Sequence, residues 1–252
     1  DTIQQLTQSN AELERFAYIA SHDLQAPLRT IGSFSSLLNK RYADSLDDDG
    51  QEYLRYIQDG VTDMRALIND LLELSRVNST EAEIVEVPME EVVGRVTDQL
   101  RADIEANAAT IHVDALPAVQ ADARGMQQIF QNLIANAMKF QPAGQAPVVR
   151  IRAERRPTGW QFSVQDNGIG MAPEDCEKIF GVFKRLHTTA EYPGTGIGLS
   201  LVRKLVEKRG GRIRVDSRPG EGSTFVFDVP DRLPASPEEL LPALERGEPL
   251  TT

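Results

Sequence analysis

The fold is decided by a stretch near the N-terminus, FAYIASHDLQAPLRTI, residues 16–31. Its apolar side chains recur at alternating steps of three and four residues, and the same spacing continues on both sides of it. The positions in this series are Ile3, Leu6, Asn10, Leu13, Ala17, Ala20, Leu24, Pro27, Ile31, Phe34 and Leu38. This heptad pattern predicts one long helix with an apolar seam.

A second heptad series follows a short break at residues 42–50, which is rich in aspartate and closes with Gly50. Its apolar positions are Leu54, Ile57, Val61, Met64, Ile68 and Leu71. Two long helices joined by a short loop predict an antiparallel hairpin. The apolar stripe on each helix is too wide for one partner, so we expect two chains to form a dimeric four-helix bundle. Asn10 on the seam could specify the register of the bundle, or it could simply occupy a frayed helix end.

Beyond residue 79 the pattern changes to short strand-like runs between helical ones. The expected strands are residues 84–87, 110–113, 148–153, 161–165, 212–216 and 224–229. Helical periodicity returns at residues 122–140 and again before the last two strands. This mixture predicts an α+β fold, in which one helical layer covers one mostly antiparallel sheet.

Three regions follow from these patterns: a helical domain at 1–79, an α/β sandwich at 80–230, and a C-terminal tail at 231–252. The tail is rich in proline and glutamate, so we expect it to be mobile or loosely docked.

The composition narrows the classes of function. A formal net charge of -11 over 252 residues argues against nucleic acid or an anionic lipid surface as a partner, so any phosphate site has to be local. The single cysteine, Cys176, excludes an internal disulfide and favours a reducing compartment. No apolar run approaches the ~18 residues that a membrane helix needs. We therefore expect no direct membrane insertion and a cytoplasmic location.

The chain starts at Asp1 and enters helical periodicity at once. This beginning without a methionine suggests that an upstream sensory domain is absent from this chain.

His22 falls at heptad position f, on the outer face of the first helix. A surface histidine is more often a solvated residue without a role, but its neighbours change that interpretation. The Asp23 carboxylate can accept a hydrogen bond from one imidazole nitrogen and raise the nucleophilicity of the other. Pro27 removes an intrahelical hydrogen bond and should kink the helix just past the histidine. A hinge beside an activated histidine is the resulting hypothesis.

A second group of polar side chains lies on the predicted helix QQIFQNLIANAMKF, residues 127–140. Asn132, Asn136 and Lys139 are spaced by four and three residues, which places them on one helix face. Amide oxygens on successive turns can hold hydrated Mg²⁺ with nucleotide phosphates, and a lysine offsets phosphate charge. The alternative is an ordinary solvated face.

Two glycine-containing segments follow. In DNGIGM, residues 166–171, Gly168 and Gly170 permit close backbone approach and Asp166 could accept a hydrogen bond from an adenine amino group, although a plain turn also explains Asp-Asn-Gly. The segment GTGIGL, residues 194–199, opens a helix that runs to about residue 208. Amides at such a helix N-terminus attract phosphate.

A dinucleotide fingerprint is the main competing reading of the second segment. It needs a strand directly before the glycines, whereas the preceding stretch, 184–193, is charged and loop-like. The lysine-bearing P-loop pattern is also absent from the sequence.

Residues 16–31 resemble the phosphoacceptor box of sensor histidine kinases of the phytochrome-like type. The later segments, in this order and spacing, resemble the N, G1 and G2 boxes of the histidine kinase ATP-binding domain, which is of the GHKL type and related to gyrase, Hsp90 and MutL. Phe180 and Phe183 are similar to the F box between G1 and G2. The resemblance covers about residues 12–229.

The resemblance implies a role for each matched residue. His22 is the phosphorylated residue and Asp23 orients it, while residues 184–192 form a mobile lid that closes on ATP. The residues implied to bind nucleotide are Asn132, Asn136, Lys139, Phe140, Asp166, Gly168, Gly170, Arg185, Gly194, Thr195, Gly196, Gly198 and Leu199, with Mg²⁺ at Asn136. His187 is expected at the surface and His112 in a structural position.

One residue departs from the family pattern. Many relatives carry threonine or asparagine four residues after the histidine, where it positions a water molecule for dephosphorylating the partner. Here the position is Ala26, which cannot hold a water, so phosphatase activity by that route is not expected.

The implied function is that of a protein-histidine kinase in a two-component system. It would act as a homodimer that moves the γ-phosphate of ATP to His22, and from there to an aspartate of a response regulator receiver domain. Two alternatives stay open. One is an ATP-driven clamp of the same ATPase family whose helices only dimerise, and the other is a signalling adaptor with an inactive nucleotide site.

Overall fold

The computed structural model describes residues 2–79, 83–188, 191–192 and 194–231, and the side chains of the first 22 residues are described only at Ser21. The side chain of Asn10 and the tail beyond Asp231 therefore lie outside the described part. The chain forms two compact units, residues 1–82 with 174–204 and residues 83–173 with 205–252. The region boundaries expected from the sequence stay predictions.

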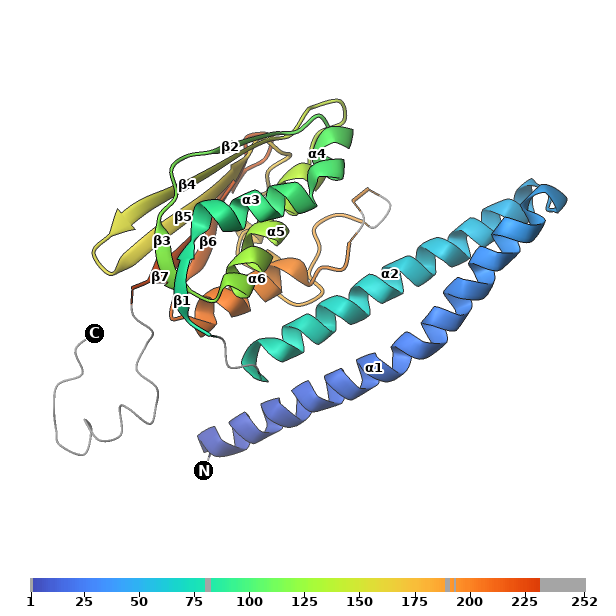
Figure 1. Ribbon diagram of the computed structural model, residues 1–252, viewed down its shortest axis with the longest axis horizontal. Coiled ribbons are helices and arrows are strands. Elements are labelled where there is room, and N and C mark those ends of the chain that lie inside the picture. The colour runs from blue at the N-terminus through green and yellow to red at the C-terminus, as the bar shows by residue number, and fades with distance from the viewer. Residues whose placement is uncertain (1, 80–82, 189–190, 193, 232–252) are drawn as a thin grey trace. The chain divides into compact units, whose positions relative to one another are not determined.

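Two long helices dominate the first unit. Helix α1 (Thr2–Tyr42) and helix α2 (Asp48–Ser79) are joined by a single 3-10 turn, η1 (Ala43–Ser45). They run side by side in opposite directions, which confirms the helical hairpin (Figure 1). Pro27 lies inside α1, which continues past it for four turns.

The interior of the hairpin repeats every seven residues. The buried positions in this repeat are Ser21, Leu28 and Ser35 on α1, and Leu54, Val61, Ile68 and Ser75 on α2. Leu28, Ile68 and Leu72 form one apolar cluster between the helices. Because a seven-residue repeat keeps one face of each helix on its partner, this pattern sets the register of the hairpin.

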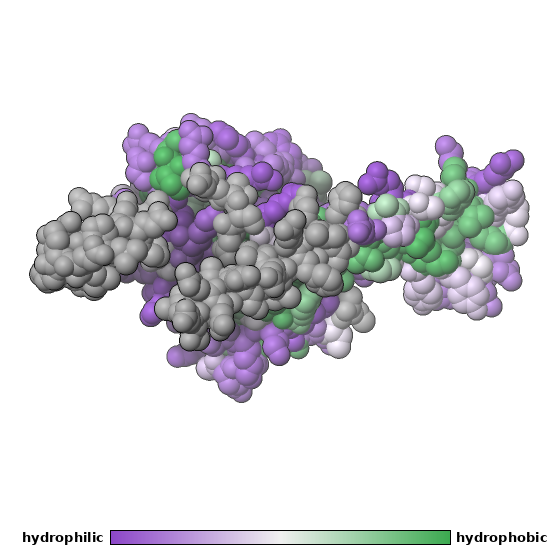
Figure 2. All heavy atoms as spheres, turned by 90° about the horizontal axis from the view of Figure 1, so that it is seen from below, coloured by the Kyte–Doolittle hydropathy of each residue, from purple (hydrophilic) through white to green (hydrophobic). Residues whose placement is uncertain are grey.

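A second apolar row on α1 does not face α2. Phe34 is 63% exposed, and Leu24, Ile31 and Leu38 are each about half exposed. Apolar side chains accordingly gather on the surface of the hairpin (Figure 2). These residues belong to the heptad series read from the sequence, so one chain covers only part of that apolar stripe.

The second unit is built on a five-stranded sheet. Its order is β2 (Thr110–Val113), β4 (Val148–Arg156), β5 (Gly159–Asp166), β7 (Gly222–Pro230) and β6 (Ile213–Arg218). Strands β2 and β4 are parallel and the other neighbours are antiparallel, which confirms the mostly antiparallel sheet predicted from the sequence. A separate antiparallel pair joins β1 (Val85–Pro88) to β3 (Ala118–Ala121), and β3 had not been predicted.

Helices cover one face of this sheet. Helix α5 (Ala123–Lys139) packs on β4 and β5, and α3 (Met89–Gln99) packs on α5, followed by the short α4 (Arg101–Ala106). The rings of Phe130, Phe162 and Phe227 meet between α5 and the sheet with centroids 5.4 to 5.9 Å apart, and none of the three is exposed. Burying three aromatic rings fixes α5 on the sheet.

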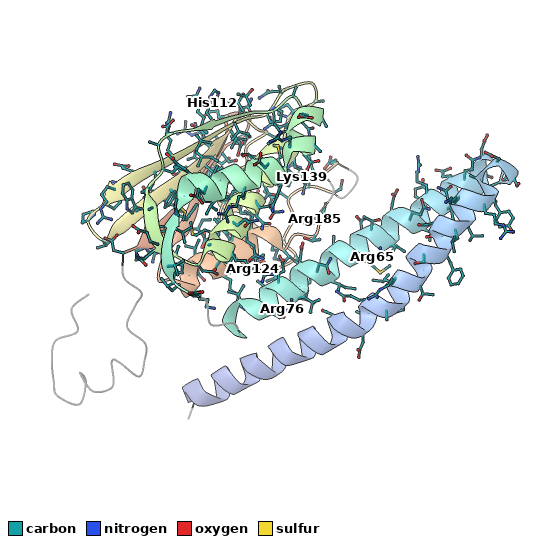
Figure 3. The ribbon with its side chains drawn as sticks, viewed as in Figure 1. Arg65, Arg76, His112, Arg124, Lys139 and Arg185 are labelled. Carbon is teal, nitrogen blue, oxygen red and sulfur yellow. The ribbon has the colours of Figure 1, made fainter. Side chains whose placement is uncertain are left out.

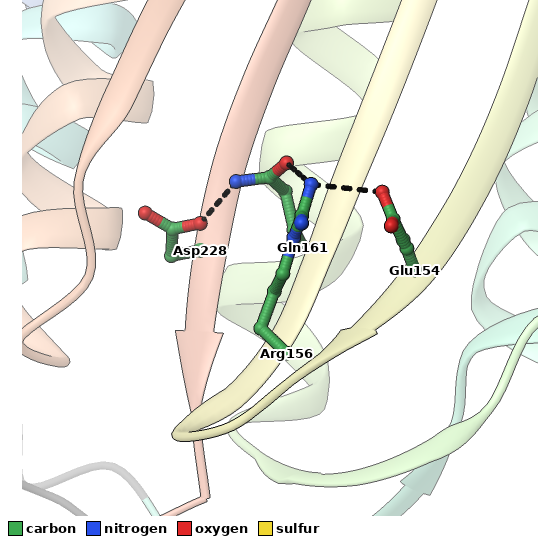
Figure 4. A network of polar contacts seen from close by, with 4 residues as sticks. All are labelled: Glu154, Arg156, Gln161 and Asp228. Carbon is green, nitrogen blue, oxygen red and sulfur yellow. Dashed lines mark hydrogen bonds and ion pairs between the residues drawn. The ribbon is translucent and has the colours of Figure 1, made fainter.

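The opposite face of the sheet is polar. Glu154, Gln161 and Asp228 lie directly across from one another on β4, β5 and β7. Arg156 donates to Glu154 and Gln161 at 2.8 and 2.9 Å, and Gln161 donates to Asp228 at 2.8 Å (Figure 4). Since this face carries a hydrogen-bonded polar ladder, the domain has two layers, one of helices and one of strands.

Helix α6 (Gly198–Lys208) follows the glycine-rich segment, and the chain passes from the first unit into the second within it. Over the residues that the structure describes, none of the helices is both long and apolar enough to span a membrane.

Candidate active site

Helix α5 carries the three polar residues predicted from its sequence. Asn132, Asn136 and Lys139 are half-buried on one side, while Leu133 and Ala137 are buried on the other. The Nδ2 of Asn132 donates to the Gln128 carbonyl at 2.9 Å, which fixes the side chain so that its Oδ1 is the atom left to face a cation or a phosphate-bound water.

Lys139 lies at the C-terminal end of α5, and its position is labelled in Figure 3. Its Nζ lies 4.4 Å from the centroid of the Phe140 ring. This contact holds the ammonium group on the last turn of the helix, where the helix dipole also favours a positive charge.

Asp166 ends β5 and is held by two backbone amides. Its Oδ1 accepts from Gly168 N at 2.8 Å and from Ser223 N at 3.1 Å. Burial raises the pKa of this carboxyl, and the two amide hydrogen bonds oppose the rise. Oδ1 is thus committed to the protein, and a hydrogen bond from a ligand amino group would use Oδ2.

The loop after β5 approaches the end of α5 so closely that only glycine fits. A Cβ added at Gly168 would overlap the Phe140 carbonyl, and one added at Gly170 would overlap the Arg218 carbonyl. Gly170 also has a φ of +63°, in the left-handed region. The Phe140 carbonyl accepts from Ile169 N at 3.0 Å, which joins the loop to the helix. This unit therefore brings Asp166, Gly168 and Phe140 together.

The segment predicted as a lid lies in the first unit, after the 3-10 turns η2 (Pro173–Asp175) and η3 (Lys178–Phe180). Phe180 is buried, and the Arg203 guanidinium stands 5.8 Å from its ring centroid. Phe183 is 58% exposed and has a φ of +61°, so only the first of the two aromatic residues is packed as an anchor.

Arg185 is turned onto the lid itself. Its guanidinium donates to the carbonyls of Gly194 at 2.5 Å and Tyr192 at 2.6 Å. His187 lies 3.8 Å from the Glu191 carboxylate, in the same loop. Figure 3 shows Arg185 in this loop and His112 on β2. In this structure the Arg185 side chain closes the loop on itself.

The segment Gly194 to Leu199 leads into the first turn of α6. The Thr195 hydroxyl accepts from Ile197 N at 3.3 Å, and Ser200 donates to the Ile197 carbonyl at 2.7 Å. A helix N-terminus preceded by glycines presents backbone amides, which suit an anionic group.

His22 lies within α1, and its side chain is outside the described part, so its predicted outward direction stays a prediction. Asp23 and Ala26 are exposed on the same helix. The residues that the structure describes contain no cluster of three or more His, Cys, Asp or Glu side chains able to hold a metal ion. Amide oxygens such as those of Asn132 and Asn136 are compatible with Mg²⁺, which takes few protein ligands and keeps its water.

Sequence reasoning missed three groups that contact candidate residues within one unit or the other. They are the Phe140 carbonyl, the Ser223 amide and Asp70 of α2, whose carboxylate accepts from Thr195 at 2.5 Å. The first two act through the backbone, which leaves no mark in the side-chain pattern. Asp70 stands 125 positions from its partner in a helix full of acidic residues, so nothing local marked it out.

Comparison with protein families gives two matches. Residues 12–80 match the family described as "His Kinase A (phospho-acceptor) domain". Residues 121–233 match the family described as "Histidine kinase-, DNA gyrase B-, and HSP90-like ATPase". The two matches include His22, the polar face of α5, the loop after β5 and the glycine-rich segment.

Similar proteins extend this result. The phytochrome-like protein Cph1 of Synechocystis sp. is 44% identical over 225 residues, covering 89% of this chain and 30% of that protein. The methanogenesis regulatory histidine kinase FilI of Methanothrix harundinacea is 35% identical, covering 91% of this chain and 26% of that protein. The chain thus spans less than a third of the length of these curated relatives.

Among solved structures, the crystal structure of full-length ShkA in complex with AMPPNP is similar, with a TM-score of 0.68 and 27% identity. The similarity covers 88% of this chain and 47% of that one, so it includes both the helical part and the sheet domain.

Replacing Asp166 separates its structural role from its binding role. The asparagine variant keeps an oxygen for the Gly168 and Ser223 amides but presents an amide in place of the second oxygen. Because the pKa of Asp166 is raised, the folded state binds its proton more tightly than the unfolded state does. The stability that the protonated carboxyl contributes is therefore lost as pH rises through the folded pKa. We expect Asp166→Asn to be at least as stable as wild type at neutral pH. Its ATP affinity should fall at least tenfold.

Asp166→Ala should lose stability as well as affinity, because it leaves two buried amides without acceptors. The expected cost is about 1–3 kcal/mol per amide. Urea unfolding and ATP titration measure the two effects. Equal stability of the two variants would contradict the geometry described for Oδ1.

Proposed function

Since the chain belongs to the sensor histidine kinases, whose phosphoacceptor and ATP-binding domains it carries in that order, we propose that it transfers the γ-phosphate of ATP to His22. The phosphohistidine then passes its phosphate to an aspartate of a response regulator receiver domain. The observation that carries the proposal is the Asp166 carboxylate, held by two amides against the end of the helix that bears Asn132, Asn136 and Lys139.

The nucleotide contacts are proposed from the residues that resemble the family's nucleotide-binding boxes. Asp166 reads the adenine amino group, and Gly168 and Gly170 let the backbone approach the ring. Asn132, Asn136, Lys139 and Phe140 line the phosphate side. The other residues proposed to contact the phosphates belong to the predicted lid and to the start of α6: Arg185, Gly194, Thr195, Gly196, Gly198 and Leu199. The AMPPNP named in the ShkA structure is an ATP analogue, which supports ATP as the nucleotide.

Mg²⁺ is proposed at the amide oxygen of Asn136, with Asn132 beside it. When bound, the ion offsets the charge that develops between the β- and γ-phosphates. The protein's part is to supply neutral oxygen ligands on successive turns of α5, because Mg²⁺ retains several waters and takes only one or two protein ligands. Lys139 adds a positive charge on the same face.

The transfer needs a neutral imidazole. One ring nitrogen of His22 attacks the γ-phosphorus in line with the departing ADP oxygen, forming the phosphorus–nitrogen bond as the bond to ADP breaks. The proton on the other ring nitrogen is held by the Asp23 carboxylate, which also offsets the positive charge that the ring acquires. The role of Asp23 is to orient the ring. It does not need to remove a proton from the attacking nitrogen, since a neutral imidazole already carries a lone pair there.

The partners follow from the same domains. A homodimer is proposed through the apolar row of α1 that α2 leaves exposed, and the receiver domain is expected to dock on the bundle near His22. The longer relatives carry additional sequence, so an upstream sensory domain belongs to the proposal as well. A cytoplasmic location is proposed on the same family ground, where ATP and the receiver are available.

Replacing the phosphoacceptor tests the proposal directly. His22→Gln should abolish labelling of the protein by γ-labelled ATP while leaving ATP affinity within about twofold of wild type, because the side chain attacks the nucleotide but does not bind it. The matched control is His112→Gln, at an exposed position of β2 outside the proposed site, which should still be labelled.

The label should be acid-labile, as a phosphoramidate is. Labelling that survives in His22→Gln would contradict the proposed acceptor. ATP hydrolysis without any labelling of the wild type would favour the ATP-driven clamp. Absence of ATP binding would favour the adaptor.

Asn136→Asp tests the metal and phosphate side of α5. A carboxylate at this position adds a negative charge beside the phosphates, so Mg·ATP affinity and the rate of autophosphorylation should each fall at least tenfold. Asn107→Asp makes the same charge change on an exposed residue of the same unit and should have little effect. An isothermal titration with and without Mg²⁺ measures the effect, and equal loss in both variants would contradict the assignment.

Phe34→Glu tests the dimer. A charge on a side chain that is 63% exposed in one chain should cost little within that chain but should prevent burial against a second copy. Sedimentation should then show monomers at micromolar concentration, with wild-type helix content by circular dichroism. Val113→Glu, exposed on β2, serves as the control and should remain dimeric. A dimeric Phe34→Glu would place the interface elsewhere.

A further inference from the structure

The hydroxyl of Thr195 is held by a carboxylate of the helical hairpin. Thr195 Oγ1 donates to Asp70 Oδ2 on α2 at 2.5 Å, and both residues belong to the first unit. The same oxygen accepts from Ile197 N at 3.3 Å. The hydroxyl proton is therefore directed at Asp70 rather than toward a nucleotide.

A second contact reinforces the first. Lys204 Nζ, on α6, donates to the Leu74 carbonyl of α2 at 3.0 Å. Asp70 and Leu74 are four residues apart, so they lie on successive turns of the same side of α2. The glycine-rich segment, residues 194–199, is thus attached to α2 directly at Thr195, and the helix that it opens is attached at Lys204.

Arg185 of the predicted lid is also hydrogen-bonded to this part of the chain. Arg185 donates to the carbonyls of Tyr192 and Gly194, the latter being the first residue of the glycine-rich segment. Two side chains proposed for the phosphates, Arg185 and Thr195, are therefore both committed to protein acceptors. This arrangement suits a segment in a resting state better than one ready to receive a triphosphate.

The charge of Asp70 also opposes the binding of a nucleotide phosphate. The carboxyl is half-buried, and burial raises its pKa while the Thr195 hydrogen bond opposes the rise. A carboxylate next to the glycine-rich segment repels an anion that approaches the same amides. Asp70 lies on α2 close to the part of α1 that carries His22. Its neighbour Asn69 accepts a hydrogen bond at 3.2 Å from Gln25, which is three residues after His22.

We infer that Asp70 is an autoinhibitory latch, which holds the glycine-rich segment on α2 through Thr195 and competes with ATP phosphate for that segment. The inference rests on the proposed function, since it takes the glycine-rich segment to be the phosphate-binding part. ATP binding requires the Thr195 hydroxyl to leave Asp70. A movement of α2 that separates the two side chains would have the same effect, so the latch couples the hairpin to nucleotide affinity.

Removing the carboxylate should strengthen nucleotide binding. A hydrogen bond to a charged acceptor has a net effect that corresponds to about a tenfold change in an equilibrium constant, so Asp70→Ala should bind ATP about tenfold more tightly. Asp70→Asn keeps an acceptor for Thr195 without the charge and should show a smaller gain. The matched control, Asp63→Ala, removes an exposed carboxylate from the same helix and should bind as wild type does.

Titration of the full chain with the Mg²⁺ complex of AMPPNP, a non-hydrolysable analogue of ATP, measures these affinities without needing catalysis. Unchanged affinity in Asp70→Ala, or an equal gain in Asp63→Ala, overturns the latch. Weaker binding in Asp70→Ala also overturns it, because Asp70 would then support the nucleotide site.

Hydrogen exchange in the absence of nucleotide gives an independent readout. Amides of the glycine-rich segment should exchange several-fold faster in Asp70→Ala than in wild type and Asp63→Ala, since the segment loses its attachment to α2. Equal exchange in all three proteins overturns the latch. A failure of the proposed function looks different: wild-type protein would remain unlabelled at His22, while the change in exchange and affinity on replacing Asp70 would persist.

Discussion

The close approach of the loop after β5 to the end of α5 is the constraint on which the second unit depends. The Phe140 carbonyl needs a donor once α5 ends, and Ile169 N supplies it at 3.0 Å. That hydrogen bond requires residue 168 to lie against the carbonyl, where any Cβ would overlap it. Because helix and loop are joined there, the loop that follows Asp166 is held against the end of the helix that carries the polar face.

The two oxygens of the Asp166 carboxylate have different roles. Asp166 uses one oxygen to satisfy two buried amides and keeps the other for recognition. The raised pKa expresses the cost of burying the charge, and the two hydrogen bonds limit that cost. Because Oδ1 accepts from two amides, the carboxylate is held in one orientation.

The hairpin is held together by a heptad repeat. A seven-residue row on each helix is buried between α1 and α2, while a second row, which includes Phe34 and Leu24, stays exposed in one chain. An apolar surface of this kind is costly for a single chain in water. The homodimer proposed above would cover this exposed row.

Much of the architecture followed from the sequence alone, because it depends on periodicity. The heptads predicted two helices and their hairpin, and the alternation of apolar residues predicted most strands and one helical layer over a mostly antiparallel sheet. Strand β3, AVQA, was not predicted because Val119 is its only β-branched residue and alanine is depleted in strands, and because its pairing with β1 joins segments at least thirty residues apart. The heptad series also could not say which row faces α2, since adjacent rows were both apolar.

The residue types of the candidate site, and their order, were likewise determined by the sequence, because glycines, amides and carboxylates at fixed spacings are local features. Only the tertiary structure decided what those groups touch. It placed the Ser223 amide on Asp166, turned Arg185 onto its own loop, and set Asp70 against Thr195 across 125 positions of the chain. Such pairings depend on how distant elements pack, and a hydrogen bond between distant residues leaves no periodic trace along the chain.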